Sequence, residues 1–255
     1  MLNLKPPSEL KKTGNRNPFI IEHLLIDRGI CLIAGLPKTK KSWLLSEFAI
    51  SIATGSKALG NCEVYNQGAV IFIQGEDSEE IISERFEQIA RAKSISSSKL
   101  SNIKVASCTD FRLDNPEHLL DLEKQITDLK AVAVFIDPLA RLIDCPDTAR
   151  APMKKLLTAL RGLQSRTGIC LVIATHLSKE AKGADLSKIS GSGDLRSVYD
   201  QAIILTKPVP HIVQGNFDFK SVSERPDFFF QLSSVNGGLM PRALGLSDTE
   251  SLKVS

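Results

Sequence analysis

The sequence predicts an α/β fold in which helices cover both faces of a mostly parallel sheet. Segments patterned as strands alternate with segments patterned as helices, which is the order typical of parallel sheets. Most expected strands are also continuous apolar runs, such as Ala69–Gln74 and Ile169–Thr175, as is typical of strands buried on both faces. After residue 208, short apolar runs are separated by Pro, Gly and Asn. These runs indicate antiparallel hairpins at the edge of the sheet.

Each element follows from its local pattern. Strands are expected at Ile30–Ala34, Ala69–Gln74, Ile103–Ser107, Val132–Ile136, Ile169–Thr175 and Gln201–Thr206. An amphipathic helix is expected from Ser42 to about Thr54, and a second helix behind Ser78, which has two acidic residues and helically spaced apolar residues after it. Two further helices are expected at Pro116–Leu129 and Pro152–Ser165.

Composition narrows the class of protein. The 255 residues carry 32 basic and 29 acidic side chains, a net charge of +3, with 42% hydrophobic residues, which is ordinary for a folded domain. No apolar run is long enough for a membrane helix or a signal peptide. The five cysteines are widely spaced without a CxxC pair, so a zinc site or disulfide framework is not expected and a cytoplasmic protein is. We expect a flexible lead-in at 1–18, one domain at 19–245 and a frayed tail at 246–255.

The strongest local motif is GLPKTKKS, which lies between the first strand and the first helix. It resembles the phosphate-binding loop G-x-x-x-x-G-K-[ST], in which backbone N–H groups, the lysine and the hydroxyl hold a nucleotide's phosphates and Mg²⁺. Lys40 replaces the second glycine, which provides backbone freedom in the usual loop. The candidate ATP-binding residues of this segment are Gly35, Leu36, Pro37, Lys38, Thr39, Lys40, Lys41, Ser42 and Trp43.

Three polar residues follow strands at the edge where ligands of parallel sheets bind. Asp137 ends the strand VAVFID, which we expect to neighbour the loop-bearing strand, and it is placed to hold Mg²⁺ together with Ser42. Glu76 is the candidate general base that orients the attacking water, although Glu76 or Asp77 could instead cap the next helix. His176 ends LVIATH and is a candidate contact to the terminal phosphate, although most single histidines are structural.

Taken together, these segments resemble the RecA-like ATPases of the RepA/DnaB hexameric helicase group. The resemblance rests on GLPKTKKSW, VIFIQGEDSEEIISERF, VFIDPLARL and VIATHLSK in that order, and it covers residues 19 to 207. It implies a RecA-like core, ATP and Mg²⁺ as ligands, a homo-hexamer and nucleotide sites between subunits. It also implies Lys41 and Ser42 as the phosphate-loop pair, Glu76 as catalytic glutamate, Asp137 as magnesium-associated aspartate and His176 as phosphate sensor.

The resemblance further implies contacts from the 178–194 segment to single-stranded DNA. Lys179, Lys182 and Lys188 suit such contacts, although nearby acidic residues nearly balance them. Ring ATPases also need a cation from the neighbouring subunit at the phosphates. The candidates for this role, between which the sequence does not choose, are Arg196, Lys220 and Arg225.

Two functions remain open on this basis. The first is an ATP-hydrolysing ring motor, a helicase of a plasmid, phage or mobile element, which Glu76 favours. The second is an ATP-dependent oligomeric switch or loader with slow hydrolysis, which the altered loop and the balanced charge of the 178–196 segment favour. A small-molecule kinase is disfavoured because no arginine-rich lid segment or second phosphate-accepting loop is evident.

Overall fold

A computed structural model describes Pro6, Ser8 and residues 17–107, 110–144, 150–177, 198–220 and 225–245. Within these residues the chain forms a nine-stranded sheet with the strand order β11-β10-β9-β8-β3-β7-β6-β4-β5. The six parallel strands are β3 (Ile30–Gly35), β4 (Ala69–Gln74), β5 (Ile103–Ser107), β6 (Ala131–Asp137), β7 (Cys170–His176) and β8 (Gln201–Val209). Antiparallel strands β9 (Ile212–Phe219), β10 (Phe228–Val235) and β11 (Gly238–Ala243) continue the sheet. The predicted α/β class and the C-terminal hairpins are therefore confirmed.

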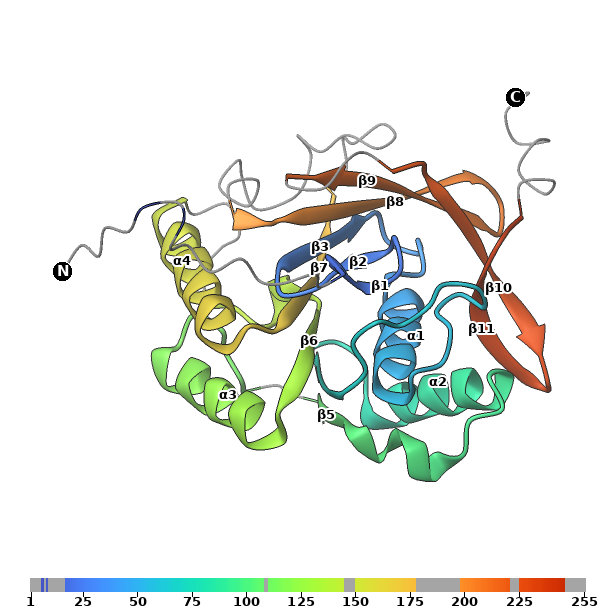
Figure 1. The fold of residues 1–255 in the computed structure, drawn as a ribbon, viewed down its shortest axis with the longest axis horizontal. Helices are drawn as coiled ribbons and strands as arrows, with labels where there is room; N and C mark the ends of the chain where they lie inside the picture. Colours follow the sequence, from blue (N-terminus) through green and yellow to red (C-terminus); the bar gives the residue numbers. More distant parts are fainter. Residues whose placement is uncertain are drawn as a thin grey trace.

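Helices cover both faces of the parallel part, as Figure 1 shows. Helices α1 (Lys41–Thr54) and α2 (Glu79–Ala92) pack on one face, and α3 (Pro116–Leu129) and α4 (Arg150–Thr167) pack on the other. Each layer has its own apolar cluster, because alternate residues of every central strand point to opposite faces. Short 3₁₀ turns η2 (Ser97–Asn102) and η3 (Leu139–Arg141) precede β5 and follow β6. No helix in the described part of the chain is long and apolar enough to cross a membrane.

The amino-terminal end of the domain contains an element that the sequence patterns did not predict. Strands β1 (Phe19–Ile21) and β2 (Leu25–Ile26) form a separate antiparallel pair. All five of their side chains are buried, and β1 contacts α1. This pair therefore closes the outer side of α1.

Two expectations about burial were wrong. Helix α1 is not amphipathic, since every residue from Leu44 to Ala53 is buried. The helix lies between the sheet, α2, β1 and β11, so it has almost no face toward solvent. Strand β5 is not covered on both faces either, because it forms the sheet's edge, and its Lys104 and Val105 are exposed.

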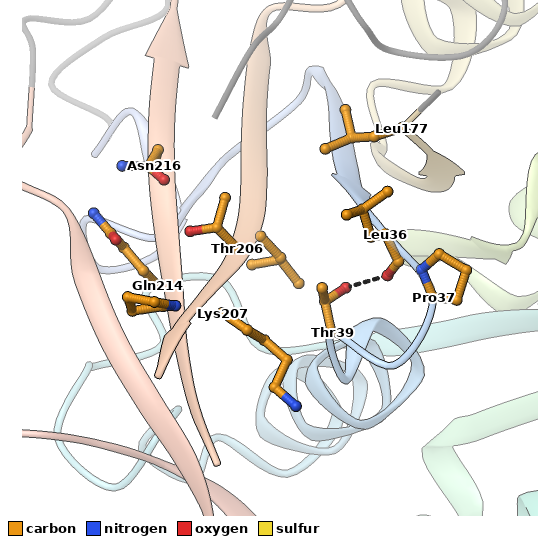
Figure 2. A pocket seen from close by; sticks show the side chains of 10 residues that line it. Leu36, Pro37, Thr39, Leu177, Thr206, Lys207, Gln214 and Asn216 are labelled. Carbon is orange, nitrogen blue, oxygen red and sulfur yellow. Dashed lines mark hydrogen bonds between the residues drawn. The ribbon is translucent and has the colours of Figure 1, made fainter. Parts of the chain in front are cut away.

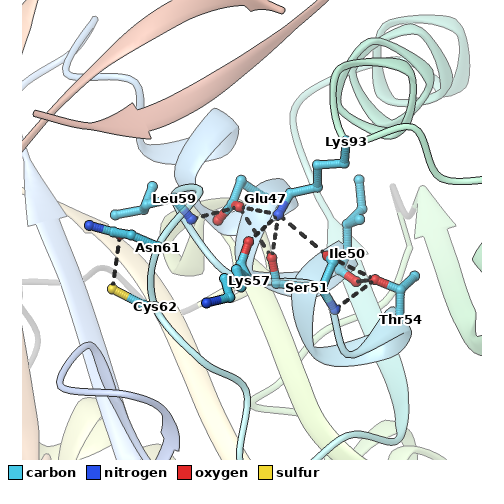
Figure 3. A network of polar contacts seen from close by, with 10 residues as sticks. Glu47, Ile50, Ser51, Thr54, Lys57, Leu59, Asn61, Cys62 and Lys93 are labelled. Atoms are coloured by element: carbon cyan, nitrogen blue, oxygen red, sulfur yellow. Dashed lines mark hydrogen bonds and ion pairs between the residues drawn. The ribbon is translucent and has the colours of Figure 1, made fainter. Parts of the chain in front are cut away.

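A buried polar network joins α1 to α2, as Figure 3 shows. Lys93, the C-cap residue of α2, places its Nζ 2.7 Å from Oε1 of Glu47 on α1. The same carboxylate oxygen accepts a hydrogen bond from the backbone N–H of Leu59 at 2.9 Å and one from the Ser51 hydroxyl at 3.1 Å. These contacts fix the relative position of two helices whose amino ends both begin at the candidate site.

Candidate nucleotide-binding site

The loop between β3 and α1 has a fixed backbone despite its missing glycine. Lys38 and Lys40 both adopt the left-handed conformation, with φ of 67° and 64°, which costs a residue other than glycine about 1–2 kcal/mol. Between them, Thr39 is buried, and its hydroxyl donates a hydrogen bond to the carbonyl oxygen of Leu36 at 2.8 Å. The loop therefore keeps a conformation suited to glycine while carrying two exposed lysine side chains.

Lys41 is the buried cation of the loop. Its Nζ donates to the carbonyl oxygens of Gly35 at 2.7 Å and Leu36 at 3.2 Å, and only 8% of the residue is exposed. Burial lowers the pKa of the Lys41 ammonium group, and the charges of Asp137 and Glu76 oppose this effect. The side chain lies along the loop at the first turn of α1, where backbone N–H groups favour an anion.

Asp137 ends β6 and is almost completely buried. Strand β7 lies between β6 and β3, so the expectation that Asp137 belongs to a strand adjacent to the loop-bearing strand was wrong. Burial raises the pKa of the Asp137 carboxyl group, and a hydrogen bond from the Ser42 hydroxyl opposes that shift. The Gln74 side-chain amide also donates to the carboxylate at 3.2 Å. A serine hydroxyl and a carboxylate in contact are donors that suit Mg²⁺.

Glu76 lies opposite the loop, directly after β4. Its backbone N–H donates to the Gln74 side chain at 3.0 Å, and its carboxylate lies 3.7 Å from the Arg141 guanidinium group. Helix α2 is capped by Ser78, whose side chain accepts from the backbone N–H of Ile81. The alternative interpretation of Glu76 as a helix cap is therefore not needed, and half of its side chain is accessible to solvent.

The sequence reasoning missed Arg85. This arginine lies on the same face of α2 as the buried Ile82 and Ile89, and its spacing within that apolar face is the signal that could have identified it. Its Nη2 forms an ion pair with Asp77 at 2.6 Å, and its guanidinium group lies 6.0 Å from the centre of the Trp43 ring. Its Nη1 is buried without a hydrogen-bond partner among the described residues.

One cavity of about 300 Å³ brings these groups together. His176 reaches it from the end of β7, the strand between β3 and β6. The residues lining the cavity are Pro37, Lys38, Thr39, Lys40, Lys41, Ser42, Trp43, Glu76, Asp77, Arg85, Asp137, Pro138 and His176. The elements of the sequence prediction that end at this edge of the sheet thus meet at one place.

The candidate cations for a neighbouring site lie elsewhere. Lys220 follows Phe219, which pairs with Gln201 at the beginning of β8, so it lies beside the start of β3 and at the opposite end from the loop. Its Nζ lies 4.9 Å from the centre of the Tyr199 ring, and the Arg225 guanidinium group lies 5.4 Å from that of Phe19. Arg196 and the 178–194 segment lie outside the described residues.

A second pocket of about 530 Å³ lies on the other side of the loop, as Figure 2 shows. It shares Pro37 and Thr39 with the first cavity. Apolar side chains of Leu36, Leu177 and Leu205 line it together with Thr206, Lys207, Pro208, Gln214 and Asn216. Asp227 accepts hydrogen bonds from the side-chain amides of Gln214 at 2.8 Å and Asn216 at 2.6 Å. Composition and motifs gave no indication of this pocket, because its polar members come from the irregularly patterned hairpins.

The fold and the cavity together define a P-loop ATPase domain of the RecA-like class. The chain belongs to the AAA domain family, whose model matches residues 4–182. Two similar solved structures support the fold: the ATPase domain of a helicase has a TM-score of 0.63, 17% identity and coverage of 84% of this chain and 85% of that chain. The RadB recombinase has a TM-score of 0.60, 14% identity and coverage of 84% and 90%, respectively. A search of curated protein sequences finds no match.

Proposed function

We propose that this chain hydrolyses ATP as a subunit of a hexameric ring motor, a cytoplasmic helicase that moves on single-stranded DNA. The convergence of Lys41, Ser42, Glu76, Asp137 and His176 on one cavity carries the proposal, because it joins phosphate-binding groups with a candidate base. A binding loop alone would support nucleotide binding only.

The triphosphate is proposed to lie against the loop and the amino end of α1. Lys41 would exchange its hydrogen bonds to the Gly35 and Leu36 carbonyl oxygens for phosphate oxygens. Ser42 and Asp137 are the residues that would hold Mg²⁺, which neutralises charge on the phosphates when it is bound. The buried, hydrogen-bonded Asp137 has the donor chemistry that this ion needs.

Hydrolysis requires a water molecule, which attacks the terminal phosphorus while the bond to the bridging oxygen breaks and ADP leaves. Glu76 is proposed to orient this water and to accept its proton. The accessible carboxylate opposite the loop supports that role. His176 ends the strand between those of the loop and Asp137, and is proposed to contact the terminal phosphate and to transmit its presence to residues 178–194.

The base of ATP is proposed to occupy the second pocket. The pocket adjoins the loop through Pro37 and Thr39, and its apolar wall with a few amide groups is typical of nucleobase sites. Figure 2 shows Leu36 and Pro37 on one side of this space and Gln214 and Asn216 on the other.

The ring and DNA parts of the proposal draw on the fold and on the sequence that follows the site. A helicase ATPase domain is among the similar folds, and Lys179, Lys182 and Lys188 lie in the segment that follows His176. A plasmid, phage or mobile element is the proposed genetic context, from the resemblance to plasmid replication helicases.

Steady-state ATP hydrolysis, with and without single-stranded DNA, tests the proposal. We expect DNA to stimulate the wild-type protein, and Glu76→Gln to bind ATP but to hydrolyse it about 10²- to 10⁴-fold more slowly. The control is Glu80→Gln, which removes an exposed carboxylate from the first turn of α2 without touching the cavity. Undiminished hydrolysis in Glu76→Gln would exclude it as the base. Hydrolysis indifferent to DNA would contradict the motor and leave an ATP-gated switch or loader.

A further inference from the structure

We propose that Lys40 is a catalytic residue whose ammonium group contacts the terminal phosphate of ATP bound in the same chain. It would supply from within the loop the positive charge that ring ATPases otherwise take from a neighbouring subunit. This inference rests on the proposed ATPase function, and goes beyond it by assigning a role to the residue that departs from the usual loop pattern.

The side chain of Lys40 is available for this contact. Lys40 is exposed, lines the phosphate cavity and makes no hydrogen bond or ion pair with the part of the chain that the structure describes. Lys41, by contrast, has its ammonium group on two carbonyl oxygens of the loop. Lys40 is also the N-cap residue of α1, so it directly precedes Lys41 and Ser42.

The backbone at Lys40 gives no folding reason for a lysine. Its φ of 64° lies in the left-handed region, which glycine adopts without strain and a residue with a Cβ does not. The exposed side chain adds no packing that would offset this strain. A strained residue that is retained without a folding benefit indicates a functional role, here the positive charge.

The cavity has the chemistry of an anion site beyond its loop. Arg85 is more than nine-tenths buried, lines the cavity and has an Nη1 without a partner among the described residues. Its Nη2 already neutralises Asp77. An unpaired buried donor requires an acceptor, and phosphate oxygens provide one. This observation is independent of the loop and of the helix terminus.

The alternative cations are engaged elsewhere in their own chain. The ammonium group of Lys220 and the guanidinium group of Arg225 pack on aromatic rings near the opposite end of the sheet. Among the described cations that line the cavity, Lys38 and Lys40 alone are exposed. Lys38 stands two residues further from α1, beyond the buried Thr39, which makes it the matched control.

The test compares Lys40→Gly, Lys40→Arg and Lys38→Gly in ATP hydrolysis and nucleotide binding. We expect Lys40→Gly to lower kcat on the order of a hundredfold and to weaken ATP binding but not ADP binding, because only ATP carries the terminal phosphate. Lys40→Arg keeps the charge and most of the activity. Lys38→Gly stays near wild type. The unfolding temperature of Lys40→Gly, equal to or above that of wild type, confirms that the variant folds.

Mixing variants distinguishes a contact within one chain from a contact between chains. Lys41→Ala lacks its own phosphate-loop lysine but still carries Lys40. If Lys40 acts within its own chain, Lys41→Ala does not restore hydrolysis to Lys40→Gly. Restored activity would show that Lys40 acts on a neighbouring site and would overturn the assignment.

Two other results would overturn it: Lys40→Gly as active as wild type, or an equal loss in Lys38→Gly. A wild-type protein that neither binds nor hydrolyses ATP would instead contradict the proposed function itself.

Discussion

Lys41 combines burial with charge at the position where the proposed ATP phosphates bind. The residue is 8% exposed, and its ammonium group is held by carbonyl oxygens, which are neutral acceptors. Burial disfavours the charged form and lowers the pKa of the Lys41 ammonium group, while Asp137 and Glu76 favour the charged form. An arriving phosphate would add negative charge and raise this pKa again. Binding of ATP and protonation of Lys41 are therefore coupled.

This coupling predicts how nucleotide affinity depends on pH. Lys41 binds phosphate in its protonated form, so the affinity of the free protein for a non-hydrolysable ATP analogue should fall as pH rises through the lowered pKa. The fall should begin below 10.5, the ordinary lysine value. Calorimetric titrations between about pH 7 and pH 11 measure it. Lys41→Ala should bind weakly without this alkaline decline, and a wild-type affinity that stays constant up to pH 10.5 would contradict the prediction.

At the scale of single residues, the sequence predicted which side chains meet but not how they are held. Motif order placed Lys41, Glu76, Asp137 and His176 at strand or loop ends, and the parallel sheet brings such ends to one edge. The ion pair between Arg85 and Asp77 depends on the rotation of α2 about its axis. A sequence pattern fixes that rotation only approximately, so Arg85 was missed.

At the scale of elements, the ion pair of Glu47 and Lys93 fixes α1 against α2. Both side chains are almost completely removed from water, at 0% and 5% exposure. The Lys93 ammonium group also donates to the carbonyl oxygen of Lys57 at 2.7 Å and to the Ser51 hydroxyl at 2.8 Å. One oxygen of Glu47, Oε2, has no partner among the described residues. The carboxylate therefore depends strongly on its lysine.

Removing that lysine should be costly. We expect Lys93→Met to lower the free energy of unfolding by about 3–5 kcal/mol, because it leaves a buried carboxylate uncompensated. The double variant Glu47→Gln, Lys93→Met removes both charges while keeping an amide oxygen for the Leu59 N–H, and should recover part of the loss. Denaturant unfolding measures both. The exposed pair Lys57–Glu63 provides the control, and Lys57→Met should have a much smaller effect. A similar loss in both single variants would contradict this account.

Element boundaries followed closely from the sequence, whereas packing did not. Apolar runs and helix caps predicted β3, β4, β6 and β7 to within a residue or two, because these signals are local. The all-round burial of α1 depends on β1, α2 and β11, which come from distant parts of the chain. The strand order, with β7 between β3 and β6, likewise reflects long-range pairing that local patterns do not encode.

At the scale of the whole molecule, the sheet has two parts with different roles. The parallel part carries the candidate site at the carboxyl ends of its strands, and the antiparallel part extends the sheet and returns to α2 through β11. Gly238 makes this return possible, since a Cβ at that position would lie 2.2 Å from the carbonyl oxygen of Gln88. The hairpins therefore support α2, behind Glu76 and Arg85, and also supply one wall of the second pocket.

The charge of the whole chain makes the proposed DNA contact testable through its salt dependence. A net charge of +3 gives little general attraction for nucleic acid, so binding to single-stranded DNA should depend on local contacts. If Lys179, Lys182 and Lys188 each neutralise one phosphate, the slope of log K against log salt should be about −2 per subunit, at about −0.7 per contact. Fluorescence titration of an oligonucleotide at several salt concentrations measures this slope.

The matched comparison replaces these three lysines with alanine and leaves the cavity unchanged. The slope should then approach zero, the affinity should fall most at low salt, and ATP hydrolysis without DNA should stay at the wild-type level. As a control, alanine at the exposed Lys99 and Lys130 on the described surface should leave the slope unchanged. A slope that the triple variant does not change would assign DNA binding to another surface. No measurable DNA binding at low salt would favour the ATP-gated switch, because a motor must hold the strand on which it moves.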